Sequence, residues 1–144
     1  MTKLRLFVLA VVAVLAAACA SGPKLSEVAS GFPGIKAGEG RVYFYRSNSM
    51  FGAALQPTIY MNGKAVGTSK PGGFFYADVP AGNVEVTTGT EVEKKATFVI
   101  AAGETRYIRT TTGLGILVGR VYPEIVDNRT GQEEMKSSSY TGGK

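Results

Sequence analysis

The dipeptide Asn62-Gly63 constrains the fold most strongly, because it stands between two runs of strand-forming residues, 57–61 and 64–67. A two-residue type I′ hairpin turn needs positive φ at both central positions, which Asn and Gly tolerate better than other residues. Such a turn also fixes the register of the strands that flank it. Counting outward from the turn predicts three cross-strand pairs: Met61 with Lys64, Tyr60 with Ala65, and Ile59 with Val66.

Short runs of β-branched and aromatic residues recur along the rest of the chain. Gly, Pro and Asn separate these runs, and no strong helical period accompanies them. The run 41–46 carries apolar side chains on both alternating faces, which predicts a central strand. The expected strands are 41–46, 57–61, 64–67, 73–79, 83–87, 93–100, 105–111 and 116–122.

Neighbouring strands are expected to pair with each other. Beyond the first hairpin, the expected pairs are 73–79 with 83–87, 93–100 with 105–111, and, more weakly, 125–127 with 132–136. Together these patterns predict an all-β fold, an antiparallel β-sandwich of about seven or eight short strands over residues 41–136.

The first eighteen residues have the three parts of a secretory signal peptide. Lys3 and Arg5 supply positive charge, residues 6–15 form an apolar core, and Ala16–Ala18 supply small residues before a cleavage site. A membrane-spanning helix needs about 20 apolar residues, and this run stops earlier. We therefore expect residues 1–18 to form a signal-peptide helix that directs export and is then removed.

Cys19 refines this expectation, because the run from Val14 to Cys19 resembles the lipobox of bacterial lipoproteins. That resemblance implies cleavage just before Cys19, a diacylglycerol on its thiol and an acylated N-terminus. Lipoboxes usually carry Leu three residues before the cysteine, where this chain has Ala16, a residue that is tolerated there. Two or more acyl chains anchor a protein stably, whereas one holds it only marginally. By analogy with the same proteins, the residue directly after the cysteine, Ala20, favours a location at the outer membrane over retention at the inner membrane.

The alternative is an ordinary signal peptide cut after Ala18 or Ala20, which would leave Cys19 as a free thiol or discard it. Cys19 is the single cysteine of the chain, so it cannot form an internal disulfide, and a free thiol is a liability in an exported protein. Lipidation of Cys19 removes this anomaly, and we prefer it.

The segments on either side of the sandwich are expected to be irregular. Residues 19–40 are rich in Gly, Ser and Pro and are expected to form the lipidated N-terminus and a flexible tether, with one helical turn near 25–29. Residues 137–144 are expected to be a disordered tail. The chain without its signal is long enough for one domain.

Composition excludes several classes of function. The chain has no histidine, which removes the commonest general base and the commonest zinc ligand. No Ser-x-x-Lys motif occurs, and the glycines at 113, 115 and 119 precede β-branched residues rather than a helix, which argues against a phosphate loop. We therefore expect no catalysis, no metal and no cofactor. Paired carboxylates could still support hydrolysis of a polysaccharide.

Net charge gives no support to nucleic-acid binding. The full chain carries a net charge of +5, which falls to +3 once Lys3 and Arg5 leave with the signal, and the remaining basic residues are scattered.

The aromatic residues are a better candidate for binding. Several would fill the core, but Phe74 and Tyr76 alternate with the apolar face of their strand and could form an exposed aromatic stripe.

Four motifs stand out within residues 41–127: Val42-Tyr-Phe-Tyr-Arg46, Pro57-x-Ile-Tyr-x-Asn62-Gly-Lys-x-Val-Gly67, Gly73-Phe-Phe-Tyr-x-x-Val-Pro-x-Gly82 and Gly103-Glu-Thr-x-Tyr107. On these motifs, residues 41–127 resemble a family of bacterial envelope lipoproteins whose domain has no assigned function, and they are also similar to the PEGA-type small β-domains of surface proteins. The resemblance rests on turns and core strands, and it implies a fold without a reaction.

These observations predict a lipid-anchored cell-envelope protein whose sandwich is a non-catalytic binding or structural module. It would face the periplasm from the outer membrane, held by Cys19, with an envelope protein or polymer as partner. A soluble periplasmic ligand-binding protein is the alternative. A carboxylate-based hydrolase of envelope polymer is the third class, and it requires two acidic side chains that converge in one cleft.

Overall fold

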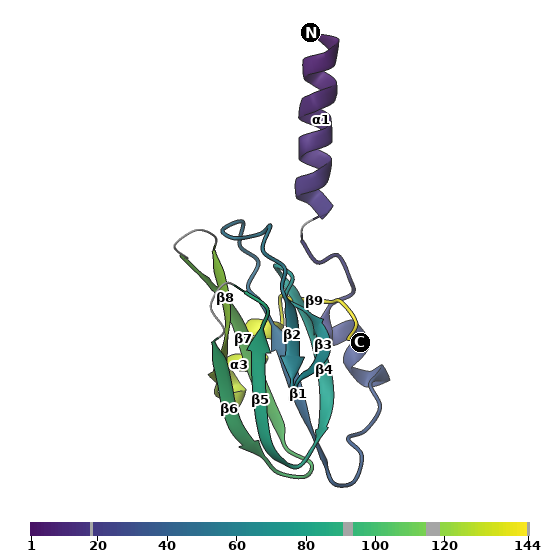
Figure 1. The fold of residues 1–144 in the computed structure, drawn as a ribbon. Helices are drawn as coiled ribbons and strands as arrows, with labels where there is room; N and C mark the ends of the chain where they lie inside the picture. Colours follow the sequence, from purple (N-terminus) through teal and green to yellow (C-terminus); the bar gives the residue numbers. More distant parts are fainter. Residues whose placement is uncertain (18, 91–93, 115–118, 144) are drawn as a thin grey trace.

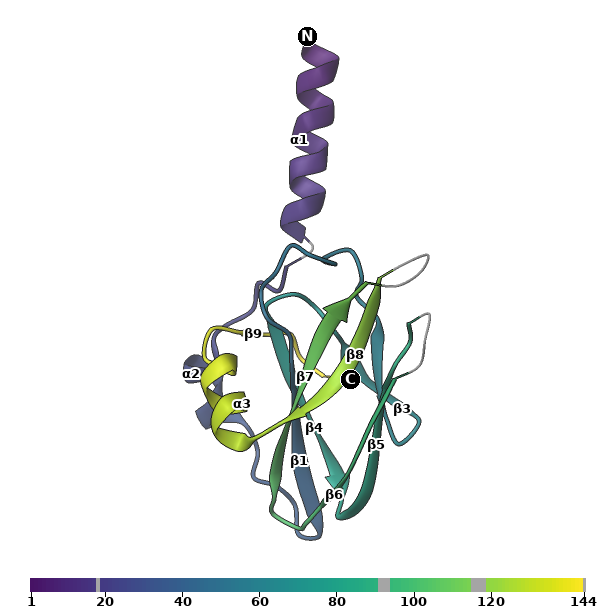
Figure 2. The same ribbon diagram turned by 90° about the vertical axis from the view of Figure 1, so that its left-hand side faces the viewer.

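In the computed structural model the chain folds into two β-sheets packed face to face, with short helices on one side and the long N-terminal helix projecting from one end (Figures 1 and 2). The structure describes residues 1–17, 19–90, 94–114 and 119–143. Within them, one sheet has the strand order β8-β7-β1-β4-β9 and the other the order β3-β2-β5-β6. The elements are α1 (Thr2–Ala17), α2 (Leu25–Val28), η1 (Ala29–Gly31), β1 (Glu39–Tyr45), β2 (Thr58–Met61), β3 (Lys64–Thr68), β4 (Gly73–Pro80), β5 (Gly82–Thr88), β6 (Lys95–Ile100), β7 (Thr105–Gly113), β8 (Arg120–Val126), α3 (Asn128–Met135) and β9 (Ser139–Tyr140).

The predicted all-β sandwich is therefore confirmed, with strands close to the expected bounds. The starts of two expected strands, at 93 and at 116–118, lie outside the described residues. The five-stranded sheet also contains two parallel pairs, β1 with β7 and β4 with β9, which the sequence did not indicate. No helix among the described residues is long and apolar enough to cross a membrane.

The hairpin at Asn62-Gly63 forms as predicted, with positive φ at both turn residues, 50° and 79°. Met61 pairs with Lys64 and Tyr60 with Ala65, but a bulge after Ile59 moves that residue opposite Gly67 instead of Val66. The bulge has a physical reason. The ring of Phe75 occupies the space where a side chain at Gly67 would lie, so this strand must approach the other sheet at a glycine.

The two hairpins expected between 73–79 and 83–87 and between 93–100 and 105–111 are wrong. β4 and β7 belong to the five-stranded sheet, whereas β5 and β6 belong to the four-stranded sheet. The turns after Pro80 and Ile100 are thus corners that carry the chain from one sheet to the other. Alternating side chains show that a strand has a buried face, but they do not show which strand lies beside it.

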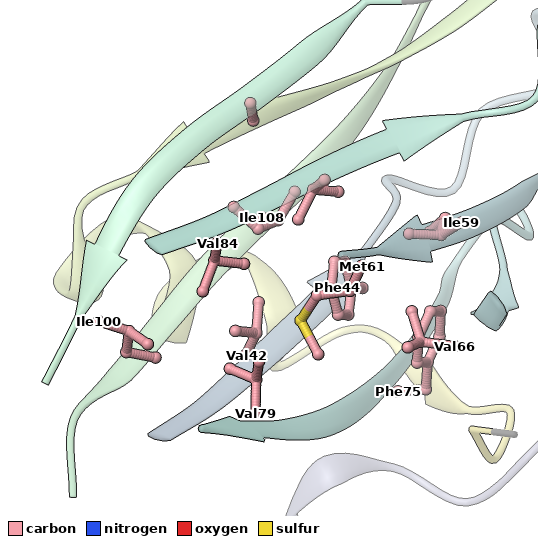
Figure 3. Close-up of a cluster of buried hydrophobic side chains, with 12 residues drawn as sticks. Val42, Phe44, Ile59, Met61, Val66, Phe75, Val79, Val84, Ile100 and Ile108 are labelled. Atoms are coloured by element: carbon pink, nitrogen blue, oxygen red, sulfur yellow. The ribbon is translucent and has the colours of Figure 1, made fainter. Parts of the chain in front are cut away.

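The main core fills the space between the sheets (Figure 3). Phe44 of β1 stacks on Phe75 of β4, with ring centroids 5.0 Å apart. The other sheet contributes Ile59, Met61 and Val86, all nearly inaccessible to solvent. A fully buried aliphatic side chain contributes about 1.5–3 kcal/mol to folding, so this core carries the stability of the sandwich.

A second core covers the outer face of the five-stranded sheet. Tyr45, Phe74 and Tyr107 project from the sheet and pack with Met135 of α3, and residues of the N-terminal segment join them. The weak hairpin expected over 125–136 is therefore wrong: residues 128–135 form α3. Asp127 caps this helix by accepting a hydrogen bond from the Thr130 backbone N–H at 3.0 Å.

The described part of the C-terminal tail, residues 137–143, is ordered in the structure, although we expected disorder. Ser139–Tyr140 forms β9 beside β4, and Tyr140 contacts the ring of Phe74. The segment expected to be a flexible tether is also held against the domain. The Tyr140 N–H donates to the Pro23 carbonyl at 2.7 Å, and Phe32 packs on the sheet. Both segments bury apolar side chains on a sheet face that the sequence pattern had treated as the outside.

The strand directions place the loops at two opposite ends of the sandwich. We call one of them the Cys19 end: it holds residues 19–22, the loops at 46–57, 69–72 and 89–90, and Leu114 after the end of β7. The opposite end holds the turns at 33–38, 62–63, 81 and 101–104. Figure 1 shows α1 projecting away from the domain at the Cys19 end.

Replacing Gly131 by alanine tests the packing of α3. A glycine-to-alanine change inside a helix ordinarily stabilises it by about 0.8–1 kcal/mol. Here a Cβ would collide with the Tyr107 ring, and overpacking of this kind costs about 1–3 kcal/mol. We expect Gly131→Ala to lower the free energy of unfolding in denaturant titrations, while Gln132→Ala, at an exposed position, does not. A stabilising Gly131→Ala would contradict this packing.

Candidate functional site

Cys19 lies at the foot of α1, against the loops of the Cys19 end. Its thiol is partly exposed and donates a weak hydrogen bond to Asn48 Oδ1 at 3.7 Å. The next residue is fixed more firmly, since the Ala20 backbone N–H donates to the Pro71 carbonyl at 3.0 Å. The residue expected to carry lipid is thus held beside the domain rather than at the far end of a loose tether.

The exposed aromatic stripe expected at Phe74 and Tyr76 is not present. Phe74 is completely buried under Tyr140, and Tyr76 lies under Phe32, with ring centroids 4.7 Å apart. The guanidinium of Arg41 covers Tyr76 further, 4.1 Å from the ring centroid. These two residues face the expected side of β4, but the two terminal segments cover that side. In this structure both side chains therefore pack against the terminal segments.

Arg41 holds the N-terminal segment against this face. It forms a bidentate pair with Asp78, at 2.7 and 2.9 Å, and also donates to the Pro33 carbonyl at 2.8 Å. The hydrogen bond with Asp78 raises the pKa of Arg41 above its usual range, against the opposing effect of burial. A buried pair of this geometry is costly to break, since either partner alone would remain as an uncompensated charge.

A hollow of about 490 Å³ opens on the outer face of the five-stranded sheet, between β1, β7, β8 and α3. We call it the Arg109 hollow. Charged and hydroxyl side chains dominate its wall, in contrast to the aromatic packing beside it. The lining residues are Tyr45, Ser47, Asn48, Arg109, Thr111, Glu124, Glu134 and Ser137.

Arg109 joins two carboxylates at the centre of this hollow. Its guanidinium lies 3.0 Å from Glu124 and 2.8 Å from Glu134, and the Tyr45 hydroxyl donates to Glu134 at 2.6 Å. Burial lowers the pKa of Arg109, but the two carboxylates outweigh that effect and the pKa is raised. Burial, followed by the bond to Glu134, raises the pKa of Tyr45. With two carboxylates to one guanidinium, the network carries an excess negative charge.

This arrangement suits recognition of a cationic or hydrogen-bond-donating group. Each carboxylate oxygen can accept more than one hydrogen bond, so Glu124 and Glu134 keep acceptor capacity beyond Arg109. Among the described residues no group of three or more His, Cys, Asp or Glu side chains could hold a metal ion. The expected turn at the glycines 113–119 lies largely outside the described residues.

Little of this hollow could be foreseen from the sequence. Arg109 and Thr111 stand two positions apart on an expected strand, so the sequence predicts that their side chains lie on the same face. Glu134 was not predicted to join them, because it was assigned to a weak strand whereas it lies on α3. Tyr45 and Arg109 are neighbours only through the parallel pairing of β1 with β7, which no local pattern indicates.

The fold and the hollow define a two-layer β-sandwich with a polar recess on a helix-covered face. A family model described as "Protein of unknown function (DUF2846)" matches residues 36–121, more than half of the chain. The chain therefore belongs to this family. It is also similar to an uncharacterized protein of Haemophilus influenzae (strain Rd), with 32% identity over 127 residues, 85% of this chain and 75% of that protein. No solved structure matches.

The hydrogen bond between Tyr45 and Glu134 predicts a loss of stability in alkaline solution. Because the folded state holds the Tyr45 proton more tightly than the unfolded state, this bond stabilises the protein below about pH 10 and is lost as the pH rises through the raised pKa. We expect Tyr45→Phe to cost about 0.5–1.5 kcal/mol at pH 8 and to show a shallower fall above pH 10.

Denaturant titrations across this pH range measure the effect. Tyr60→Phe, on the other sheet, is the matched control. Equal alkaline slopes for wild type and Tyr45→Phe would show that Tyr45 does not hold its proton in this network.

Proposed function

We propose that this chain is a lipid-anchored protein of the bacterial cell envelope, attached through Cys19. The observation that carries the proposal is the position of Cys19: it lies two residues after the last residue of an apolar helix and is held at one end of the domain. Lys3 and Arg5 before that helix, and the lipobox-like run ending at Cys19, support export and lipidation. Ala20 favours the outer membrane, with the domain in the periplasm.

We further propose that the sandwich is a binding module and that the Arg109 hollow is its recognition site. The hollow combines an open volume with an excess negative charge beside a tyrosine hydroxyl. This chemistry suits an envelope protein or polymer that presents an amine or guanidinium group. A soluble periplasmic ligand-binding protein would share the hollow but lack the anchor.

A second candidate is a carboxylate-based hydrolase of envelope polymer, because Glu124 and Glu134 do converge in one hollow. Glycoside hydrolysis needs one carboxyl group that is protonated and can act as a general acid. Both carboxylates here form ion pairs with Arg109, and Glu134 also accepts a hydrogen bond from Tyr45, so neither is free to contact a glycosidic bond. We therefore prefer binding over hydrolysis.

Metabolic labelling with a palmitate analogue tests the anchor. We expect label on the wild-type chain and none on Cys19→Ser, because acylation requires the thiol. Ser21→Ala, two residues downstream, is the control and should be labelled normally. Equal labelling of wild type and Cys19→Ser, or a mature N-terminus downstream of Cys19, would defeat the proposal.

Incubation with isolated peptidoglycan separates binding from hydrolysis. We expect the purified wild-type protein to release no more soluble fragments than the Glu124→Gln/Glu134→Gln double variant. Each substitution preserves the size of the side chain and removes its charge. Fragment release by wild type that the double variant abolishes would favour the hydrolase.

A further inference from the structure

Exposed apolar side chains are concentrated at the Cys19 end of the domain. Outside α1, the large hydrophobic side chains that are more than half exposed in the described residues are Met50 and Phe51, at 60% and 55%, Leu114, at 83%, and Val99, at 62%. Met50, Phe51 and Leu114 lie in loops of the Cys19 end, whereas Val99 stands alone near the end of β6. None of the exposed large hydrophobic side chains lies in the described turns of the opposite end. Such an asymmetry indicates a surface that contacts something apolar.

The loop that carries Met50 and Phe51 is built to present them outward. Its backbone turns on itself, with Ala53 N–H donating to the Met50 carbonyl at 3.1 Å and Leu55 N–H to the Gly52 carbonyl at 2.9 Å. Gly52 supplies the positive φ, 67°, that this turn needs. Ala53 points inward and is buried, whereas the two larger side chains point into solvent.

The buried guanidinium of Arg46 fixes this loop to the sandwich. Arg46 is 3% exposed, and it donates to the carbonyls of Leu55 at 2.5 Å and Gly52 at 2.7 Å. Burial lowers its pKa, which shows that the environment disfavours the charge. Moving the loop would leave these buried N–H donors without their carbonyl partners, which is costly, so Arg46 holds the loop in a shape that keeps Met50 and Phe51 outside.

We propose that Met50, Phe51 and Leu114 insert into the interfacial region of the lipid bilayer and set the orientation of the domain on the membrane. The inference rests on the proposed lipid anchor, which brings the bilayer to this end. Asn48, two residues before Met50, contacts the Cys19 thiol at 3.7 Å. The apolar loop and the anchored residue are therefore neighbours, and one membrane surface can meet both. Interfacial segments bury their apolar side chains roughly 5–10 Å deep.

Tryptophan fluorescence can test this insertion, because the chain contains no tryptophan. Phe51→Trp places a single reporter in the loop, and Val99→Trp places one on the side of the sandwich, where Val99 is 62% exposed. The full-length lipidated proteins are reconstituted into zwitterionic phosphatidylcholine vesicles with or without bromine on the acyl chains. We expect brominated lipid to lower the emission of the Phe51→Trp protein by about half and to leave that of the Val99→Trp protein nearly unchanged, given the shallow depth of interfacial insertion.

Adding Met50→Ser and Leu114→Ser to the Phe51→Trp chain should reduce this quenching at least twofold, since fewer apolar groups then hold the loop in the lipid. Met50 and Leu114 are both exposed, so the unfolding temperature of this triple variant should stay close to that of the Phe51→Trp protein. Sedimentation of the protein with the vesicles reports the anchor separately from the depth of the loop.

The outcomes separate the two proposals. Co-sedimentation with no quenching of the loop reporter, or with equal quenching of both reporters, would overturn the insertion while the anchor stands. Loss of co-sedimentation together with loss of palmitate label would overturn both. A blue shift of the loop reporter that depends on protein concentration and not on bromine would assign the surface to a second copy of the chain, and this also overturns the proposal.

Discussion

The structure depends on the burial of both faces of β1. Val42 and Phe44 point into the space between the sheets, while Tyr43 and Tyr45 point to the opposite side. A strand of this kind cannot lie in a sandwich with one solvated face, because its outer aromatic side chains would remain in water. The five-stranded sheet therefore needs a second cover, and α3 together with both terminal segments provides it. Figure 2 shows α2 and α3 on the same side of that sheet.

This second cover explains why Cys19 has a defined position. The chain enters along the outer face, where Lys24 donates to the Ser137 carbonyl at 2.7 Å and to the Ser139 hydroxyl at 3.1 Å. The tail returns along the same route, and Ser139 N–H donates to the Gly72 carbonyl at 2.8 Å. Each terminal segment thus stabilises the other. The burial of aromatic side chains on one sheet face fixes the residue proposed to carry lipid at one end of the domain.

Most of the strands were predictable from the sequence, because the alternation of side chains and the turn residues act locally. Asn62-Gly63 specified its hairpin and two of its three pairs. The arrangement of strands into sheets was not predictable, since β4 and β5 have the same local pattern as a hairpin although they lie in different sheets. The candidate site could not be predicted from the sequence for the same reason. Glu134 reaches Arg109 only through a helix, and Tyr45 only through parallel pairing.

The Arg109 hollow and the apolar loop are parts of one arrangement, because Ser47 and Asn48 line the hollow and lead directly into Met50 and Phe51. With the loop in the lipid interface, the hollow would open beside the membrane surface rather than toward the middle of the periplasm. A ligand would then have to present its cationic group close to the bilayer. Under the two proposals, the partner is an envelope component held at the membrane rather than a freely diffusing solute, since an anchored and oriented site would meet a surface-bound partner at high effective concentration.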